Sequence, residues 1–340
     1  MGQQDRGTRK TQAHVGWSVT SRDLPEISPE NYLKIMDAET YAQWLRGQGQ
    51  QVVRTASTYW HSEGLRVYQA FPYHRLIVPS TLELSEMFYQ HRAIALRYCT
   101  PEDSAEGCPS YSIVFENDRY DLDVLGYRTR KNVRRGLRNC HVEAITFRRL
   151  ADEGWLVRTD ALERQGRRLT VTRDLWRKRY LSAADLPGFQ AWGATVGDHL
   201  AGYIVTFRMG ECLCIIDQQS HRDYLNLNVN NALTFVVSQD AVRDPDVKLV
   251  FYGHESLDAP PRVTEFKLHM GYEAKAVRQC IKFHPFVSPF VNPLLYFATR
   301  YAATAFPKNR ALSKAAGMLR FCLAEKNGLR PRTANLKSSA

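Results

Sequence analysis

Residues able to donate or accept a proton lie at the ends of predicted strands in the second half of this 340-residue chain. Tyr252 ends a predicted strand at 248–252, Glu255 follows it, and Asp217 lies near the end of another strand at 212–218. A carboxylate in such a place is a candidate general base, and a phenol is a candidate proton donor to a leaving group. Glu255 is the first choice as base and Asp217 the reserve. Buried tyrosines and strand-end acids are also common where no catalysis occurs.

Basic residues are concentrated in a predicted helix that runs from Asp121 to about Asn139. Those spaced by three or four, which fall along one helix face, are Arg128, Lys131, Arg135 and Arg138, and the surface is widened by Arg130 and Arg134. Like charges at this spacing repel each other, and a polyanion such as tRNA, a phosphorylated lipid or CoA would neutralise them. A solvated helix face explains the pattern equally well.

The whole chain is also basic. Lysine and arginine total 46 against 35 acidic residues, and the net charge of +11 favours polyanionic partners such as nucleic acid, phosphorylated cofactors or an anionic membrane surface. The content of 44% hydrophobic and 24% charged residues is typical of a folded globular protein, and the length favours two domains. The N-terminus lacks the apolar core of a signal peptide. We therefore expect a cytoplasmic protein, free or peripheral to a membrane, of undetermined oligomeric state.

Common catalytic and cofactor motifs are missing from the sequence. It contains no phosphate loop, no G-x-S-x-G elbow, no H-E-x-x-H and no complete dinucleotide fingerprint. His254 and Glu255 lack a second histidine at ligand spacing, and Cys212 and Cys214 alternate along a strand as small buried hydrophobic residues do. Seven cysteines without a C-x-x-C pair indicate neither disulfides nor zinc. The sequence therefore predicts no metal site and no tightly bound cofactor.

The first half of the chain mixes helices and short strands. After a lead-in at 1–28, Ser28, Pro29 and Glu30 favour the start of a helix that reaches about Gly47. The elements predicted next are strands at 51–57, 65–70, 94–99 and 110–116 and a helix at 82–90. The basic helix is then followed by a strand at 142–147 and helices at 152–164 and 173–182.

The second half opens on a predicted antiparallel meander, with apolar runs at 191–196, 200–208 and 212–218 joined by short turns. The order βββ-α-β-α-β is completed by a helix at 229–243, a strand at 248–252, a helix at 262–269 and a strand at 273–283. We expect residues 191–283 to form one mixed sheet with these two helices on its faces and Tyr252 near its centre.

Two further helices are predicted at 293–306 and 309–326. The second has an apolar stripe, and its side chains either pack on the preceding domain or contact a membrane. Packing is the favoured interpretation, because a helix that follows the last strand of a domain usually buries its apolar side there.

This element order resembles the GNAT acyltransferase superfamily, whose chains often end in a helix, a Leu-Gly-Phe-like tripeptide and a strand. The corresponding tripeptide here is Met270-Gly271-Tyr272. Phe266-Lys267 ahead of it is similar to the Phe-Lys…Phe-Gly segment of the Fem-type aminoacyltransferases and of related proteins of polysaccharide biosynthesis. The basic segment from Tyr127 to Val142 is similar to the basic helix of that family, which ends near a Gly-Val turn into a strand.

The resemblance implies an α/β fold with a mixed sheet, built from two pseudo-repeated GNAT-like halves and followed by C-terminal helices. The expected domains are a flexible lead-in (1–28), an N-terminal half (29–147), an acyltransferase half (148–285), C-terminal helices (286–328) and a basic tail (329–340).

The sequence departs from the superfamily at its cofactor loop. GNAT proteins place a glycine-rich loop before the helix that binds the pyrophosphate of acetyl-CoA. This chain has no glycine between Gly210 and Gly253, so ordinary use of acetyl-CoA is in doubt, and Fem-like relatives typically lack the loop too. The residues that could still bind an anionic donor are Arg222, Asn226, Asn228, Val229 and Asn230, with Arg130, Lys131, Arg134 and Arg135 of the basic helix.

The resemblance implies an acyltransferase or aminoacyltransferase of cell-envelope or polysaccharide biosynthesis, with acyl-CoA or aminoacyl-tRNA as donor and an amine as acceptor. Lys267, carried over from the Phe-Lys motif, would contact the substrate through its charge, although a surface lysine on an amphipathic helix is an equal interpretation. Glu255 or Asp217 would accept the proton of the amine, and Tyr252 would protonate the leaving group. The alternative is a non-catalytic basic module of the same fold that binds nucleic acid or an anionic membrane surface.

Overall fold

A computed structural model of the chain describes residues 29–258 and 260–327, so the predicted lead-in and basic tail lie outside the described residues. Its helices are α1 (Pro29–Gly47), α2 (Thr81–Tyr89), α3 (Tyr127–Asn139), α4 (Phe147–Arg164), α5 (Arg173–Leu181), α6 (Val229–Arg243), α7 (Pro261–His269), α8 (Pro293–Ala305) and α9 (Arg310–Lys326). Its strands are β1 (Val52–Arg54), β2 (Tyr59–Ser62), β3 (Val67–Phe71), β4 (Ala95–Thr100), β5 (Cys108–Phe115), β6 (His141–Ile145), β7 (Phe189–Val196), β8 (His199–Met209), β9 (Cys212–Ser220), β10 (Leu249–His254) and β11 (Glu273–Phe283). Short 3₁₀ turns are η1 (Leu122–Val124), η2 (Arg222–Leu227) and η3 (Ser288–Phe290).

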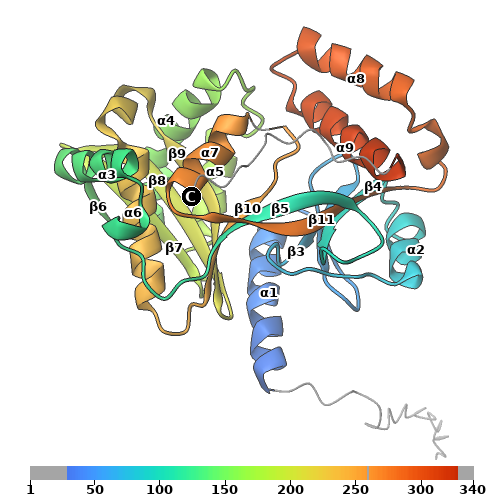
Figure 1. Ribbon diagram of the computed structural model, residues 1–340, viewed down its shortest axis with the longest axis horizontal. Helices are drawn as coiled ribbons and strands as arrows, with labels where there is room; N and C mark the ends of the chain where they lie inside the picture. The colour runs from blue at the N-terminus through green and yellow to red at the C-terminus, as the bar shows by residue number, and fades with distance from the viewer. Residues whose placement is uncertain (1–28, 259, 328–340) are drawn as a thin grey trace, which may run out of the picture.

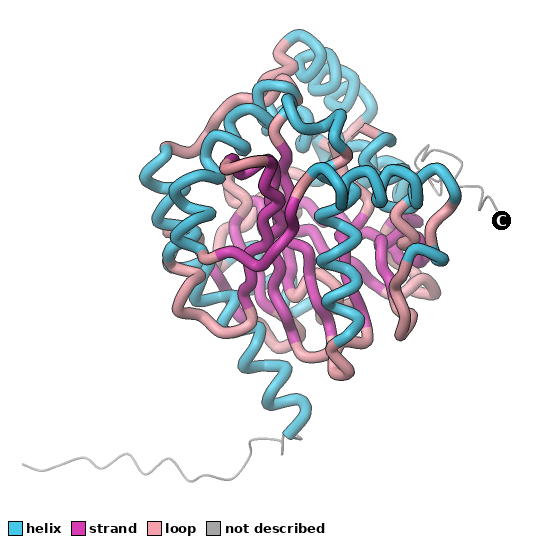
Figure 2. Tube along the Cα trace, turned by 90° about the vertical axis from the view of Figure 1, so that its left-hand side faces the viewer, coloured by secondary structure: helices cyan, strands magenta, loops and turns pink. Residues whose placement is uncertain are grey.

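All eleven strands of the described residues join one mixed sheet, in the order β1-β2-β3-β4-β11-β5-β10-β9-β8-β7-β6 (Figure 1). β3 and β4 are parallel, as are β9 and β10, and the other neighbours are antiparallel. Figure 2 shows the strands lying between helices on both sides of the sheet. The predicted α/β class with a mixed sheet is confirmed.

β5, from the first half of the chain, lies between β10 and β11 of the second half. Ser112 of β5 is opposite His254 of β10 on one side and Lys275 of β11 on the other. The strands of residues 191–283 all join one mixed sheet, as predicted, but a strand from outside that range separates the last two of them. Tyr252 lies on β10, near the middle of the sheet, as predicted.

α3 and β6 pack with elements that follow them in the chain. β6 pairs with β7, and α3 lies so close to the start of α6 that a Cβ on Gly136 would be 2.6 Å from the Asn228 carbonyl oxygen. A glycine is thus required at this helix contact. The predicted domain boundary between residues 147 and 148 stays a prediction.

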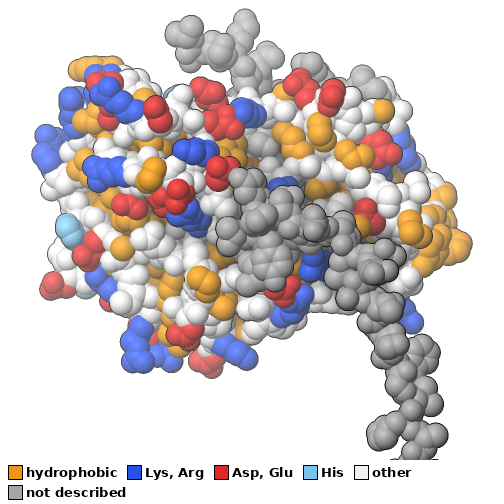
Figure 3. All heavy atoms as spheres, turned by 90° about the horizontal axis from the view of Figure 1, so that it is seen from below, with side chains coloured by type: hydrophobic (Ala, Val, Ile, Leu, Met, Phe, Trp, Pro, Cys, Tyr) orange, Lys and Arg blue, Asp and Glu red, His pale blue; other side chains and the backbone are white. Residues whose placement is uncertain are grey.

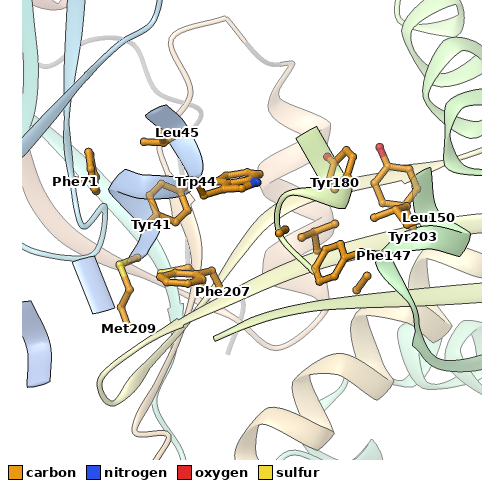
Figure 4. Close-up of a cluster of buried hydrophobic side chains, with 14 of the residues drawn as sticks. Tyr41, Trp44, Leu45, Phe71, Phe147, Leu150, Tyr180, Tyr203, Phe207 and Met209 are labelled. Atoms are coloured by element: carbon orange, nitrogen blue, oxygen red, sulfur yellow. The ribbon is translucent and has the colours of Figure 1, made fainter. Parts of the chain in front are cut away.

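An aromatic core lies on the face of the sheet that carries α1, α4 and α5 (Figure 4). The Tyr41 ring of α1 is 5.1 Å from the Phe207 ring of β8, and Trp44 Nε1 donates a hydrogen bond of 2.9 Å to the Arg179 carbonyl of α5. The first described helix is therefore packed on the second half of the chain. The other face is covered by α3, α6 and α7, with separate apolar clusters beneath them.

Two helix starts and one strand differ from the predictions. α3 begins at Tyr127 instead of Asp121, because the Asp121 carboxylate caps the short η1 turn by accepting from Asp123 N. α4 begins before Asp152, because the Thr146 hydroxyl caps it by accepting from Arg149 N at 3.1 Å. β2 is a strand that the sequence does not predict.

The C-terminal helices lie at the end of the sheet formed by the first half (Figure 1). α9 buries Ala316, Leu319 and Phe321 against β11 and β5, which confirms the interpretation that its apolar stripe packs on the protein. α8 packs on α9 and contains no buried residue. Among the described helices, none is both long enough and apolar enough to cross a bilayer.

Candidate active site

A cavity of about 480 Å³ opens where the parallel strands β9 and β10 part. Their pairing ends at Cys214 and Phe251, although both strands continue. The cavity is lined by residues 215–220 of β9, Tyr252 of β10, Arg262, Val263, Phe266 and Lys267 of α7, Arg164 and Gln165 at the C-terminal end of α4, and Asn230 of α6. Three of the predicted catalytic residues, Asp217, Tyr252 and Lys267, therefore share one site.

A β-bulge turns Asp217 toward α4 and α5. Val205 of β8 is opposite Asp217 while the next residue, Thr206, is opposite Ile215, so Ile216 is the extra residue. Bulges of this kind change the direction in which the following side chain points, and they are frequent beside active sites. The side chain of Asp217 consequently meets polar groups from two helices.

The Asp217 carboxylate is held by four donors. Its Oδ2 accepts hydrogen bonds from the Tyr180 hydroxyl at 2.7 Å and the Tyr203 hydroxyl at 3.3 Å, and it lies 3.7 Å from Arg158 Nη1. Its Oδ1 accepts from Gln219 Nε2 at 3.2 Å. Burial and the charge of Asp217 hold the pKa of both tyrosines well above the usual range, so the phenols stay neutral donors. Oδ1, with one partner, retains capacity to accept a hydrogen bond from a ligand in the cavity.

Lys267 is a half-buried lysine with no carboxylate partner among the described residues. Its Nζ donates a 2.6 Å hydrogen bond to the Tyr252 main-chain carbonyl and lies 4.4 Å from the centre of the Tyr252 ring. Burial lowers the pKa of Lys267 to about 8. At neutral pH the amine is therefore mainly a cation, and it can face a negative charge that forms in the cavity.

Tyr252 lies between Lys267 and the polar side chains of β9. Its hydroxyl donates to the Gln218 side-chain carbonyl and lies 3.3 Å from the Thr234 hydroxyl of α6. Burial raises the pKa of this phenol above its usual value, so it is protonated at neutral pH and can donate.

Glu255, the first choice as base, does not line the cavity. Its side chain is buried and accepts a 2.9 Å hydrogen bond from the Ser110 hydroxyl of β5, and burial raises the pKa of its carboxyl group. A register shift at Gly253 on β10 precedes this change of direction. Asp217, the reserve, is thus the carboxylate that lies with Lys267 and Tyr252.

In the loop before α6, the groups of Arg222 that could bind an anion are already paired with carboxylates of the protein. Arg222 donates its main-chain N–H to Asp160 of α4 at 2.7 Å, and its guanidinium pairs with both Asp160 and Glu163.

The other residues predicted for this loop have separate surroundings. Asn226 is exposed, Asn228 adopts the left-handed conformation at the start of α6 (φ 61°), and Val229 is buried. Asn230 alone among these predicted residues lines the cavity, and its side-chain oxygen accepts a hydrogen bond from Ser220.

The basic helix α3 lies away from the cavity and presents its cations outward. Arg130 pairs with Asp123 at 3.6 Å. No ion pair among the described residues involves the exposed Arg128, Lys131, Arg134, Arg135 or Arg138. Figure 3 shows Lys and Arg side chains at its left-hand edge, the side on which Figure 1 draws α3. These five residues are called the α3 cations below.

One group of side chains in the described part of the chain has the composition and spacing of a metal site. It consists of His74, Cys212 and Cys214, and none of the three lines the cavity.

No protein-family model matches the sequence, and no curated protein is significantly similar to it. Among solved structures, the crystal structure of FemX is similar at 10% identity and a TM-score of 0.53, over 76% of this chain and 96% of that one. The C-terminal domain of a putative lysylphosphatidylglycerol synthetase from Agrobacterium fabrum aligns at 11% identity and a TM-score of 0.48, over 73% and 92% of the two chains. A tandem GNAT protein from the clavulanic acid biosynthesis pathway aligns at 15% identity and a TM-score of 0.43, over 68% and 82%.

Proposed function

Because the chain has a GNAT/Fem-like fold, as the sequence predicts, we propose that it is an aminoacyltransferase that moves an aminoacyl group from aminoacyl-tRNA to an amine. One observation carries this proposal. Asp217, Tyr252 and Lys267 line the same cavity, which lies where the parallel strands β9 and β10 diverge. A cavity at this point is a usual place for a ligand in a sheet with parallel strands.

Acyl transfer needs a base, a charge that faces the developing oxyanion, and a proton for the leaving group. In the proposed reaction the amine nitrogen attacks the ester carbonyl, and Asp217 accepts the proton that the nitrogen loses and later releases it to solvent. The Lys267 cation faces the oxyanion of the tetrahedral intermediate. When the bond between the carbonyl carbon and the ribose oxygen breaks, Tyr252 donates the proton to that oxygen and is reprotonated from solvent.

Two features favour aminoacyl-tRNA over acyl-CoA as the donor. Asp160 occupies the N–H group of the α6 loop that would otherwise bind a pyrophosphate, and it also neutralises Arg222 there. The α3 cations have no acidic partners among the described residues, and a row of such residues suits the repeated phosphates of a nucleic acid.

The test is a transfer assay in which tRNA charged with a labelled mixture of amino acids, or a set of acyl-CoA thioesters, is offered with small amines as acceptors. Amide formed from charged tRNA and not from thioesters is the expected result. Transfer from thioesters alone would contradict the choice of donor. Binding of tRNA without transfer to any amine would instead favour the non-catalytic basic module.

Replacing Arg128, Lys131, Arg134 and Arg135 together with glutamine is expected to raise KM for charged tRNA about tenfold and to leave kcat nearly unchanged. The reason is that these cations would meet the tRNA equally in the ground state and the transition state. The slope of log KM against log salt concentration should also flatten, by about one unit for each phosphate that the variant no longer neutralises.

The matched control removes four exposed cations elsewhere, Arg92, Arg148, Arg243 and Lys248, so that the net charge changes equally. This control should behave as the parent protein. If both quadruple variants gave the same KM and salt slope, the α3 cations would be a solvated helix face.

A further inference from the structure

The segment that contains η3 and α8 exposes a large amount of apolar surface. Six large side chains in it are each between 60% and 78% exposed, namely Phe286, Phe290, Leu294, Phe297, Tyr301 and Phe306. Leu294, Phe297 and Tyr301 recur at helical spacing, so they share one face of α8. We call these six residues the α8 surface. Exposure of this size is uncommon on a soluble protein and marks an interaction site.

The part of the chain that carries the α8 surface is basic, although Arg310 and Lys314 in it pair with Asp258 and Glu63. No acidic residue occurs from Ala274 to Ala324, whereas this stretch contains eight lysines and arginines. Arg300 and Lys308, which flank the exposed aromatic residues, are exposed and form no ion pair with any described residue. The surface therefore combines apolar side chains with unneutralised cations.

A second cavity, of about 820 Å³, opens at the C-terminal end of α8 beside Phe306. Five cations line it, Arg158, Arg167, Arg168, Lys308 and Arg310, and its lining includes no acidic residue. Arg167, Arg168 and Lys308 have no acidic partner within ion-pair distance among the described residues. Such a cavity suits a phosphate group that reaches it from the side of α8.

We propose that the α8 surface docks the protein on an anionic lipid bilayer, with α8 lying in the plane of the interface and lipid phosphates meeting the cations at its C-terminal end. α8 has 13 residues and is about 20 Å long, too short to cross the bilayer core of about 30 Å. A second copy of the chain fits less well, because a twofold contact through this face would bring cations against cations.

Sedimentation with vesicles tests this inference, which does not depend on the proposed transfer reaction. The full chain is expected to bind vesicles of phosphatidylglycerol and phosphatidylcholine at least tenfold more tightly than vesicles of phosphatidylcholine alone. Replacing Leu294, Phe297 and Tyr301 with serine should weaken that binding tenfold or more, while Tm stays unchanged. Replacing Arg300 and Lys308 with glutamine should remove the preference for anionic vesicles.

The matched control replaces Leu65, Val78 and Leu156, which are equally exposed elsewhere, with serine. It should bind vesicles as the parent does. Equal vesicle binding by the parent and the α8 triple variant would overturn the proposal, and so would a dimer in light scattering that only the α8 triple variant loses.

A different observation concerns the buried group formed by His74, Cys212 and Cys214. The two sulfur atoms are 3.7 Å apart, Cys214 Sγ is 3.7 Å from His74 Nδ1, and all three atoms lie within 4.8 Å of one another. In tetrahedral zinc sites, bonds of about 2.3 Å to sulfur and about 2.0 Å to nitrogen hold two sulfurs about 3.8 Å apart and a sulfur and a nitrogen about 3.6 Å apart. Two of the three separations match those of zinc ligands, and the third, between Cys212 Sγ and the His74 ring, is within 4.8 Å.

The three ligands come from both halves of the chain. Cys212 and Cys214 alternate on β9 and so share one face, and His74 comes from the loop after β3 and contacts the Phe251 ring at 6.4 Å.

We infer that these three residues form a zinc site. It would link the two halves of the chain on the face of the sheet that carries α1, α4 and α5. Binding of Zn²⁺ would release the two thiol protons. The two thiolates would then neutralise the metal charge, and the imidazole is neutral, so the site would carry no net charge in its apolar surroundings. Sequence analysis predicts no metal because the histidine is far from the cysteines in the chain.

Metal analysis of protein produced with zinc in the medium is expected to find about one zinc per chain. The double variant Cys212→Ser, Cys214→Ser should hold less than a tenth of that amount, while Cys99→Ser, which removes another buried thiol, should retain it. The parent protein with Co²⁺ in place of zinc should show thiolate-to-cobalt charge-transfer absorption. A parent protein without zinc and without this absorption would overturn the inference, whether or not the double variant folds.

Discussion

Replacing Lys267 with alanine is expected to lower kcat/KM for aminoacyl transfer at least 100-fold, because removal of one donor to an oxyanion typically costs this much. The fold should remain intact. Because the pKa of Lys267 is lower in the folded protein than in the unfolded chain, burial of the charged amine destabilises the fold below about pH 8. This destabilisation diminishes as the pH rises above that value. The measurements are steady-state kinetics and thermal unfolding, with Lys275→Ala, an exposed lysine of β11 paired with Glu116, as the control.

The pH profile separates the possible roles of Lys267. If the cation is required, kcat/KM falls as the pH rises through about 8, and Lys267→Arg moves this fall upward because arginine keeps its charge. If Lys267 were instead the base, activity would rise over the same range. Unchanged kcat/KM in the alanine variant would show that the lysine carried over from the Phe-Lys motif does not contact the substrate.

Replacing Asp217 with asparagine is expected to lower kcat 100-fold to 10,000-fold, the usual range for loss of a general base. Asparagine has nearly the same shape and can still accept from Tyr180, so the fold should be retained, with a lower Tm because Arg158 loses its charge partner. The control is Asp244→Asn, which loses a surface ion pair with Arg208 far from the cavity.

The basicity of the acceptor distinguishes a base from a positioning residue. Every amine nitrogen must lose a proton as the amide forms, but an acceptor of low basicity gives a more acidic N–H in the tetrahedral intermediate and can lose it to water, so the deficit of Asp217→Asn should shrink with such an acceptor. A deficit of the same size for every acceptor would mean that Asp217 only holds Tyr180, Tyr203 and Arg158 in place.

The elements of the second half can be predicted closely from the sequence, and those of the first half less well. α6 and β11 have the predicted bounds, because long apolar runs are separated by clear turn residues. β2 escapes prediction because four residues that include His61 and Ser62 carry little strand signal. The position of β5 cannot be predicted, since its apolar pattern shows that it is buried but not which strands are its neighbours.

The candidate site can be predicted in part. The Phe-Lys motif indicates Lys267, and the end of a predicted strand indicates Tyr252. The structure brings these two residues together. Glu255 and Asp217 are both strand-end acids, and sequence does not show the two register shifts that turn the first away from the cavity and the second toward it. Tyr180 and Arg158, which hold Asp217, lie on helices whose sequences give no sign of that contact.

The position of β11 between β4 and β5 has a consequence for synthesis of the protein. On the ribosome, β4 and β5 leave the exit tunnel long before β11, yet β11 is the strand that lies between them in the finished sheet. Until Phe283 has emerged, each of these strands has an unpaired edge, and such edges are sites of association with other chains. The nascent first half thus depends on the last strand to close its sheet, and a truncated chain that stops before residue 273 would retain both open edges.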